Sequence, residues 1–181
     1  TLCSVNYFYS REEEEWRGLA PAARPRRVLV IGGGPAGVEA ACRGADIVIL
    51  ATSQERPVLD GDWVGPGTCV MAIGYHTPES GELDGKTLAK ADRVVCDDVA
   101  ANLVESGDII QALRHGLKRR EELIDLGRIV AGEAPGRLGE GEITVYRSIG
   151  KACQDLAVGL EAYRRAVAAG VGTEFAFDSP A

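Results

Sequence analysis

The chain has 181 residues, enough for one domain with a buried core but too few for two complete lobes. Its formal net charge is -7 at pH 7, so a basic patch that would bind nucleic acid or an anionic membrane is not expected. The five cysteines are scattered without a Cys-x-x-Cys pair, which indicates reduced thiols and no metal site. No apolar run reaches the length of a membrane helix and no signal pattern opens the chain, so we expect a soluble, cytoplasmic protein.

Residues 1–26 are predicted to form an irregular N-terminal arm. They show no sustained apolar periodicity, and Pro21 and Pro25 interrupt them. The four consecutive glutamates at 12–15 are typical of a solvated charge run.

A predicted strand at 27–31 runs directly into the pattern Gly-x-Gly-x-x-Gly. In such a βα unit, Gly32 permits the tight turn, Gly34 lets the backbone approach a phosphate, and Gly37 lets the next helix pack closely. The free amides at the start of that helix, with its dipole, would face the anion. A purely structural glycine turn is the alternative. The predicted pyrophosphate-binding segment comprises Gly32, Gly33, Gly34, Pro35, Ala36 and Gly37.

Beyond this segment, apolar runs alternate with helical patterns, which is typical of an α/β fold whose strands are buried on both faces of a parallel sheet. Further strands are predicted at 45–51, 68–73, 93–96 and 143–146. Helices are predicted at 35–43, 86–91, 99–105 (capped by Asp97 or Asp98), 109–113, 121–129, and from 148 to a glycine stop at Gly170. The pattern predicts one truncated, Rossmann-like domain over 27–175, with flanking helices, and a loose tail at 176–181.

The last helix has the clearest period. Five residues at three- and four-residue spacing fall on one stripe, whereas the charged residues lie elsewhere. The stripe comprises Ala152, Leu156, Leu160, Tyr163 and Val167.

The second strand ends in Ala51-Thr52-Ser53 and carries no acid at its tip. A Rossmann unit usually places an Asp or Glu there to hold the ribose, so we expect this ribose ligand to be missing. Asp46 lies at the beginning of the strand, which is the wrong end. The hydroxyls of Thr52 and Ser53 are candidates to reach the ribose or the nicotinamide amide, with simple turn capping as the alternative.

From Ala45 onward the chain resembles the ornithine cyclodeaminase/mu-crystallin family. The similar stretches are 45–53, Gly74-Tyr75-His76-Thr77-Pro78 with Glu82-Leu83-Asp84, then 105–108, 132–137 and 144–157. The resemblance implies NAD or NADP on a Rossmann domain and a small amino or cyclic imino acid as substrate, with a homodimer as a further implication. It also implies an N-terminal lobe that holds the substrate carboxylate, for which these residues offer no counterpart.

The resemblance assigns roles to several residues. The cyclodeaminases carry an aspartate at the position of His76, whereas the pattern Gly-x-His-Thr-Pro is similar to the ketimine-reductase type. His76 is therefore a candidate proton donor to the substrate. The alternative is a histidine that only belongs to the loop. Ser148 and Gly150 would lie beside the nicotinamide, although helix capping by Ser148 explains the same residues. Gly74 and Ala51 complete the expected cofactor site.

Residues 1–41 resemble a different family, the NADH:flavin oxidoreductases of the old-yellow-enzyme and dienoyl-CoA-reductase type. The resemblance rests on 3–6, 11–12 and 21–41, including the glycine pattern, and implies FAD as an alternative cofactor. A cysteine at the place of Cys3 can ligate an iron–sulfur cluster there, but the other ligands are absent from this sequence. The two resemblances meet near 42–44.

Three functions remain open from the sequence. The first is an NAD(P)-binding domain of a cyclodeaminase-type oxidoreductase, similar to the ketimine or pyrroline-carboxylate reductases and lacking its substrate lobe. The second is an FAD- or NAD(P)-binding fragment of a flavin oxidoreductase, and the third is a non-catalytic nucleotide-binding remnant. Without a substrate lobe to supply positioning, this chain alone is expected to react slowly or not at all.

Overall fold

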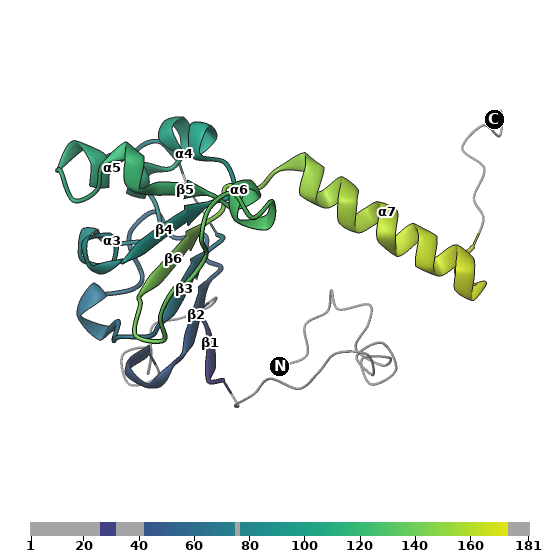
Figure 1. Cartoon of the computed structure of the whole chain (residues 1–181), viewed down its shortest axis with the longest axis horizontal. Coiled ribbons are helices and arrows are strands. Elements are labelled where there is room, and N and C mark those ends of the chain that lie inside the picture. The colour runs from purple at the N-terminus through teal and green to yellow at the C-terminus, as the bar shows by residue number, and fades with distance from the viewer. Residues whose placement is uncertain (1–25, 32–41, 75–76, 174–181) are drawn as a thin grey trace.

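The computed structural model describes residues 26–31, 42–74 and 77–173, and its centre is a parallel six-stranded sheet (Figure 1). The strand order across the sheet is β1-β2-β3-β6-β4-β5. The strands are β1 (Val28–Ile31), β2 (Ile47–Leu50), β3 (Cys69–Ala72), β4 (Arg93–Cys96), β5 (Leu123–Asp125) and β6 (Thr144–Arg147). Because all of these strands run in one direction, their carboxyl ends meet along one edge of the sheet, here called the carboxyl edge, and their starts meet along the opposite amino edge.

Helices α3, α4 and α5 lie along one side of the sheet, whereas α7 extends away from it (Figure 1). The helices are α3 (Gly85–Lys90), α4 (Val99–Glu105), α5 (Gly107–Arg114), α6 (Leu126–Val130) and α7 (Ala152–Ala169), with short 3-10 turns η2 (Gly61–Trp63) and η3 (Arg120–Glu122). Asp84 and Asp98 start α3 and α4 by accepting the backbone amides of Thr87 and Ala101.

The core lies on one face of the sheet. Alternate residues of the strands are fully buried there, among them Val48, Leu50, Val70 and Val145. The residues between them are half-buried in β2, β3 and β6, whereas Val95 of β4 is buried, and on the outermost strand β1 Val28 and Val30 are 54% and 61% exposed. The prediction that the strands are buried on both faces is therefore confirmed at β4 and wrong at β1.

Most of the predicted elements are confirmed, including the parallel pairing of the first strand with the second. The predicted helix at 121–129 is wrong, because η3, β5 and α6 divide that segment. A three-residue strand is too short to show a period, and it forms only because β4 offers it a free edge. The predicted helix at 35–43 lies mostly outside the described residues.

The last helix begins at Ala152, later than predicted, and ends at Gly170 in the left-handed conformation with φ 63°. None of its residues is buried. Lys151 occupies the position before its first turn, so capping by Ser148 is wrong.

Candidate functional site: the carboxyl edge

The sequence-predicted site residues that the structure describes lie at the tips of neighbouring strands on the carboxyl edge. Ala51, Thr52 and Ser53 follow β2, Gly74 follows β3, and Ser148 and Gly150 follow β6. The glycine-rich segment 32–37 and His76 lie outside the described residues. In open α/β sheets, ligands bind at this edge, so the fold brings the described candidates together in the expected place.

Glu82 joins the tips of β2 and β3. It is completely buried, and its Oε1 accepts hydrogen bonds from the Thr52 amide and the Thr52 hydroxyl, both at 2.7 Å. Its Oε2 accepts the Gly74 amide at 2.6 Å. A Cβ at Gly74 would collide with this carboxylate and with the Thr52 backbone, so the position requires glycine.

The same bonds decide what Thr52 can offer to a ligand. Its hydroxyl proton is directed to Glu82, and its oxygen is 3.4 Å from the Gln54 amide, as in a local turn. Ser53, by contrast, is exposed at the same tip. Of these two hydroxyls, that of Ser53 is the one better placed to donate to a bound ligand.

Arg147 supplies the counter-charge to Glu82. It ends β6 and is completely buried, with Nη1 3.1 Å from the Ala72 carbonyl, to which it donates, and 3.8 Å from Glu82 Oε2. Its Nε donates to Ser106 Oγ at 2.9 Å and to Asp108 Oδ1 at 3.2 Å. A buried charge is tolerated when it is paired and hydrogen-bonded in this way, so the four side chains form one buried cluster beneath the carboxyl edge.

Asp97 holds the segment that follows β6. Its Oδ2 accepts the Ser148 hydroxyl at 2.9 Å and the amides of Ile149 and Gly150 at 3.0 and 2.9 Å. Gly150 has φ 86°, a conformation that favours glycine. Asp98, not Asp97, caps α4 through the Ala101 amide. Because Asp97 occupies both loop amides, they are not free to bind a phosphate.

Sequence reasoning missed the roles of Glu82, Arg147, Asp108 and Asp97. One signal was available, since Arg147 directly follows the predicted strand at 143–146 and is part of the observed strand β6, where a buried charge is unusual. Its partners come from segments far apart in the sequence, so only the fold identifies them.

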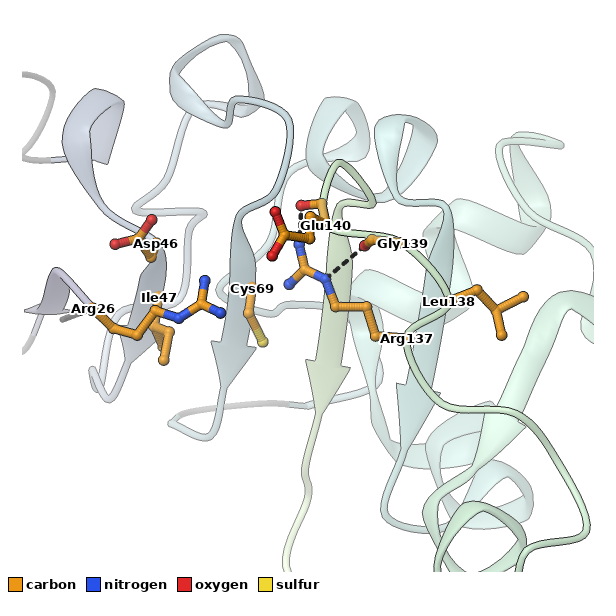
Figure 2. A pocket seen from close by; sticks show the side chains of 8 residues that line it. All are labelled: Arg26, Asp46, Ile47, Cys69, Arg137, Leu138, Gly139 and Glu140. Atoms are coloured by element: carbon orange, nitrogen blue, oxygen red, sulfur yellow. Dashed lines mark hydrogen bonds between the residues drawn. The ribbon is translucent and has the colours of Figure 1, made fainter. Parts of the chain in front are cut away.

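Two cavities lie at the opposite, amino edge of the sheet. One of them, shown in Figure 2, has a volume of about 450 Å³ and is lined by Arg26, Asp46, Ile47, Cys69 and residues 137–140. The Arg137 guanidinium is engaged in closing this loop, donating to the carbonyls of Gly67, Gly139, Glu140 and Glu142 at 2.6–3.0 Å. Asp46 lies here and accepts the Arg27 amide, as expected for an acid at the wrong end of its strand to bind a ribose.

Cys96, at the end of β4, is buried. Burial first, and then the negative charges of Asp97 and Asp108, raise the pKa of the Cys96 thiol to about 12. Cys96 therefore stays protonated and unreactive at neutral pH. Within residues 26–31, 42–74 and 77–173, no group of three or more metal-binding side chains is clustered, and no helix there has the length and apolarity needed to cross a membrane.

The sequence is similar to a known protein family and to its members. The ornithine cyclodeaminase/mu-crystallin family model matches residues 33–170. A Delta(1)-pyrroline-2-carboxylate reductase of Bacillus cereus is 36% identical over 138 residues, which are 76% of this chain and 42% of the reductase. The chain thus spans less than half the length of this relative.

Two solved structures have a similar fold. The Thermococcus litoralis Delta(1)-pyrroline-2-carboxylate reductase in complex with NADH and L-proline has a TM-score of 0.68 at 35% identity, over 76% of this chain and 42% of that one. The iminosuccinate reductase of Paracoccus denitrificans in complex with NAD+ has a TM-score of 0.67 at 32% identity, over 78% and 43%.

The flavin-oxidoreductase resemblance of residues 1–41 gains no support, since the family match begins at residue 33, inside the glycine-rich segment. That match includes the sheet from β2 onward, the carboxyl edge and α7. The chain belongs to the ornithine cyclodeaminase/mu-crystallin family.

Proposed function

We propose that residues 27–175 form the NAD(H)-binding domain of a reductase or dehydrogenase that acts on a small amino or cyclic imino acid. The observation that carries this proposal is the meeting of Ser53, Gly74 and Gly150 at the tips of three neighbouring strands, next to the strand that leads into the glycine-rich segment. Two family members of similar fold bind NADH or NAD+, which supports the choice of cofactor.

The donor set fits a dinucleotide in part. Residues 32–37 would hold the pyrophosphate, Ser53 would donate to the ribose or the carboxamide, and the Gly150 segment would lie beside the nicotinamide. The nearest acid to the β2 tip is Glu82, which is buried and already accepts three hydrogen bonds, so it is not a ribose ligand. The bound cofactor supplies the hydride.

His76 is the proposed proton donor to the substrate nitrogen. It lies two residues after Gly74 in the sequence, and Gly74 follows β3 at the carboxyl edge. An imidazole has an ordinary pKa near working pH, which suits it to deliver a proton during imine reduction. In a complete enzyme, His76→Gln should lower kcat while leaving NADH affinity unchanged.

The test is a titration of the 181-residue chain with NADH, NADPH and FAD, followed by fluorescence or calorimetry. NADH should bind to the parent, and Gly34→Val should abolish binding because its side chain blocks the approach to the phosphates. Gly65→Val at the amino edge is the matched control, since the space around Gly65 is open, and it should bind normally. Failure of every nucleotide to bind, or unchanged binding by Gly34→Val, would exclude the glycine-rich site.

The same titration separates the alternatives. NADPH binding in place of NADH would change only the cofactor preference. A yellow protein that binds FAD would favour the flavin interpretation. NADH binding without turnover of pyrroline-2-carboxylate would leave the chain as a nucleotide-binding domain.

A further inference from the structure

Asp97 lies at the carboxyl end of β4, beside the tip of β6. It is 7% exposed, and both of its carboxylate oxygens accept hydrogen bonds. Oδ1 accepts the Asp98 amide and the side-chain amide of Asn102, each at 2.9 Å. Oδ2 accepts three donors from the loop 148–150. A carboxylate offers about four acceptor positions, so these donors leave none of them for a ligand.

The bonds to Asp97 also fix where the carbonyls of this loop point. The described residues contain no cis peptide bond, and in a trans peptide the N–H and the preceding C=O point in opposite directions. The amides of Ile149 and Gly150 point to the buried carboxylate, so the carbonyls of Ser148 and Ile149 point away from it. Among the residues that the structure describes, none donates to either carbonyl. The loop therefore presents hydrogen-bond acceptors on the side that faces away from Asp97.

This polarity decides which part of a dinucleotide the loop suits. A pyrophosphate is an anion that accepts hydrogen bonds, so two backbone carbonyls would not bind it. The nicotinamide ring carries a carboxamide, whose NH2 group has two donors. The loop therefore suits the nicotinamide end of the cofactor.

We propose that Asp97 is a positioning residue for the nicotinamide half of the cofactor. By accepting the donors of the loop, it holds the carbonyls of Ser148 and Ile149 where they accept the carboxamide NH2. This inference rests on the proposed function, which places the Gly150 segment beside the nicotinamide. It adds that the two halves of NADH are held separately, the pyrophosphate by residues 32–37 and the nicotinamide through Asp97.

Calorimetric titration of the 181-residue chain with NADH and with ADP-ribose, which lacks the nicotinamide, tests this division. The parent should bind NADH more tightly than ADP-ribose. Asp97→Ala releases the loop and should weaken NADH binding about tenfold, the equivalent of one good hydrogen bond, with ADP-ribose binding unchanged. Asp84→Ala is the matched control, since Asp84 also accepts two backbone amides but at the start of α3, and both ligands should bind to it as to the parent.

Gly150→Ala disturbs the loop without emptying a buried position. Gly150 has φ 86° and no other atom within 4 Å of an added methyl group, so the substitution strains the loop backbone alone. This variant should also weaken NADH binding and leave ADP-ribose binding unchanged. Gly132→Ala is its matched control, because Gly132 has φ 75° and equally open surroundings but lies outside the loop.

A cofactor analogue tests the two carbonyls directly. In the reduced acetylpyridine analogue of NADH, an acetyl group replaces the carboxamide, so the NH2 donors are missing. The parent should bind this analogue more weakly than NADH, whereas Asp97→Ala should bind the two alike.

The outcomes separate this inference from the proposed function. Equal weakening of NADH and ADP-ribose by Asp97→Ala, or unchanged NADH binding in both loop variants, would overturn the role of Asp97 and leave the cofactor site in place. If Asp97→Ala does not fold, Gly150→Ala and the analogue decide, and equal binding of NADH and the analogue to the parent would overturn the inference. Failure of the parent to bind either NADH or ADP-ribose would overturn the proposed function and this inference with it.

Discussion

The two edges of the sheet hold their strands by different means. At the carboxyl edge, Glu82, Arg147 and Asp108 are buried, and they bind strand tips and one another. At the amino edge, the charged pairs are more exposed, as for Arg27 and Asp46, whose side chains are 73% and 24% exposed. A cavity of about 450 Å³ lies at the amino edge, whereas the fully buried charged side chains lie at the carboxyl edge.

The burial of its charges decides how strongly each edge fixes the strands. An exposed ion pair contributes little to stability, because solvent screens it and two long side chains must be ordered. A buried cluster is costly unless its geometry is complete, and here it fixes the tips of β2, β3 and β6 relative to one another. A rigid set of strand tips is what a cofactor site requires, whereas cavity volume alone is not.

The largest effect is expected from Arg147→Met. The substitution leaves Glu82 and Asp108 buried without their cation, and breaking a buried pair costs about 3–5 kcal/mol. Urea denaturation should show that loss in the free energy of unfolding. A loss below about 1 kcal/mol would mean that the cluster behaves like a surface pair and would remove the distinction between the edges.

Gly74→Ala should have the next largest effect. The added methyl group has no room between Glu82 and Thr52, and overpacking of this kind costs about 1–3 kcal/mol. Its control is Gly65→Ala at the amino edge, where a methyl group would meet no other atom within 4 Å and little change is expected. Equal unfolding free energies for the two variants would contradict the tight packing of the carboxyl edge.

The pH dependence of stability offers a smaller, directional test. Asp98 follows β4, and the hydrogen bond from Lys151, then that from the Ala101 amide, lowers its pKa below the ordinary value of 3.8. A lowered pKa contributes stability that is complete above the unfolded-state pKa and is lost as the pH falls through the folded-state pKa. The difference in unfolding free energy between the parent and Asp98→Asn should therefore be constant from about pH 5 to 7 and should approach zero below about pH 4. A difference that grows on acidification would refute this assignment.

The smallest effect is expected from Arg27→Met at the amino edge. Arg27 Nε lies 3.6 Å from Asp46 Oδ2, and the arginine side chain is largely exposed. Exposed pairs contribute at most about 1 kcal/mol, so the unfolding free energy should change by no more than that. Because Arg147→Met is the same substitution at the other edge, the ratio of the two losses measures the comparison directly.

The sheet could largely be predicted from the sequence, because most of its strands are apolar runs such as 45–51 and 93–96. The start of α4 could also be predicted, since Asp98, one of two candidate caps, lies directly before it. The edge strand β5 could not, since three residues carry no period and its strand state depends on pairing with β4. The helix α7 and its apolar stripe could also be predicted from the sequence. What the stripe packs against could not, since within the described residues no residue of α7 is buried.

For the candidate site, the residues at the strand tips could be predicted, but the buried side chains that hold them could not. Ser53, Gly74 and Gly150 could be placed at strand tips from the order of elements. The interactions that fix them could not, because Glu82 acts across the tips of two strands and Asp97 across the loop after a third. Such contacts depend on three-dimensional proximity and not on spacing along the chain.

Amide hydrogen exchange with and without saturating NADH tests the central claim most directly, since it reports both edges in one experiment. Binding at the carboxyl edge predicts added protection at residues 51–53, 74 and 148–150, with Cys69 and residues 137–140 unchanged. Protection confined to the amino edge, or none at either edge, would contradict the assignment of the carboxyl edge as the cofactor site.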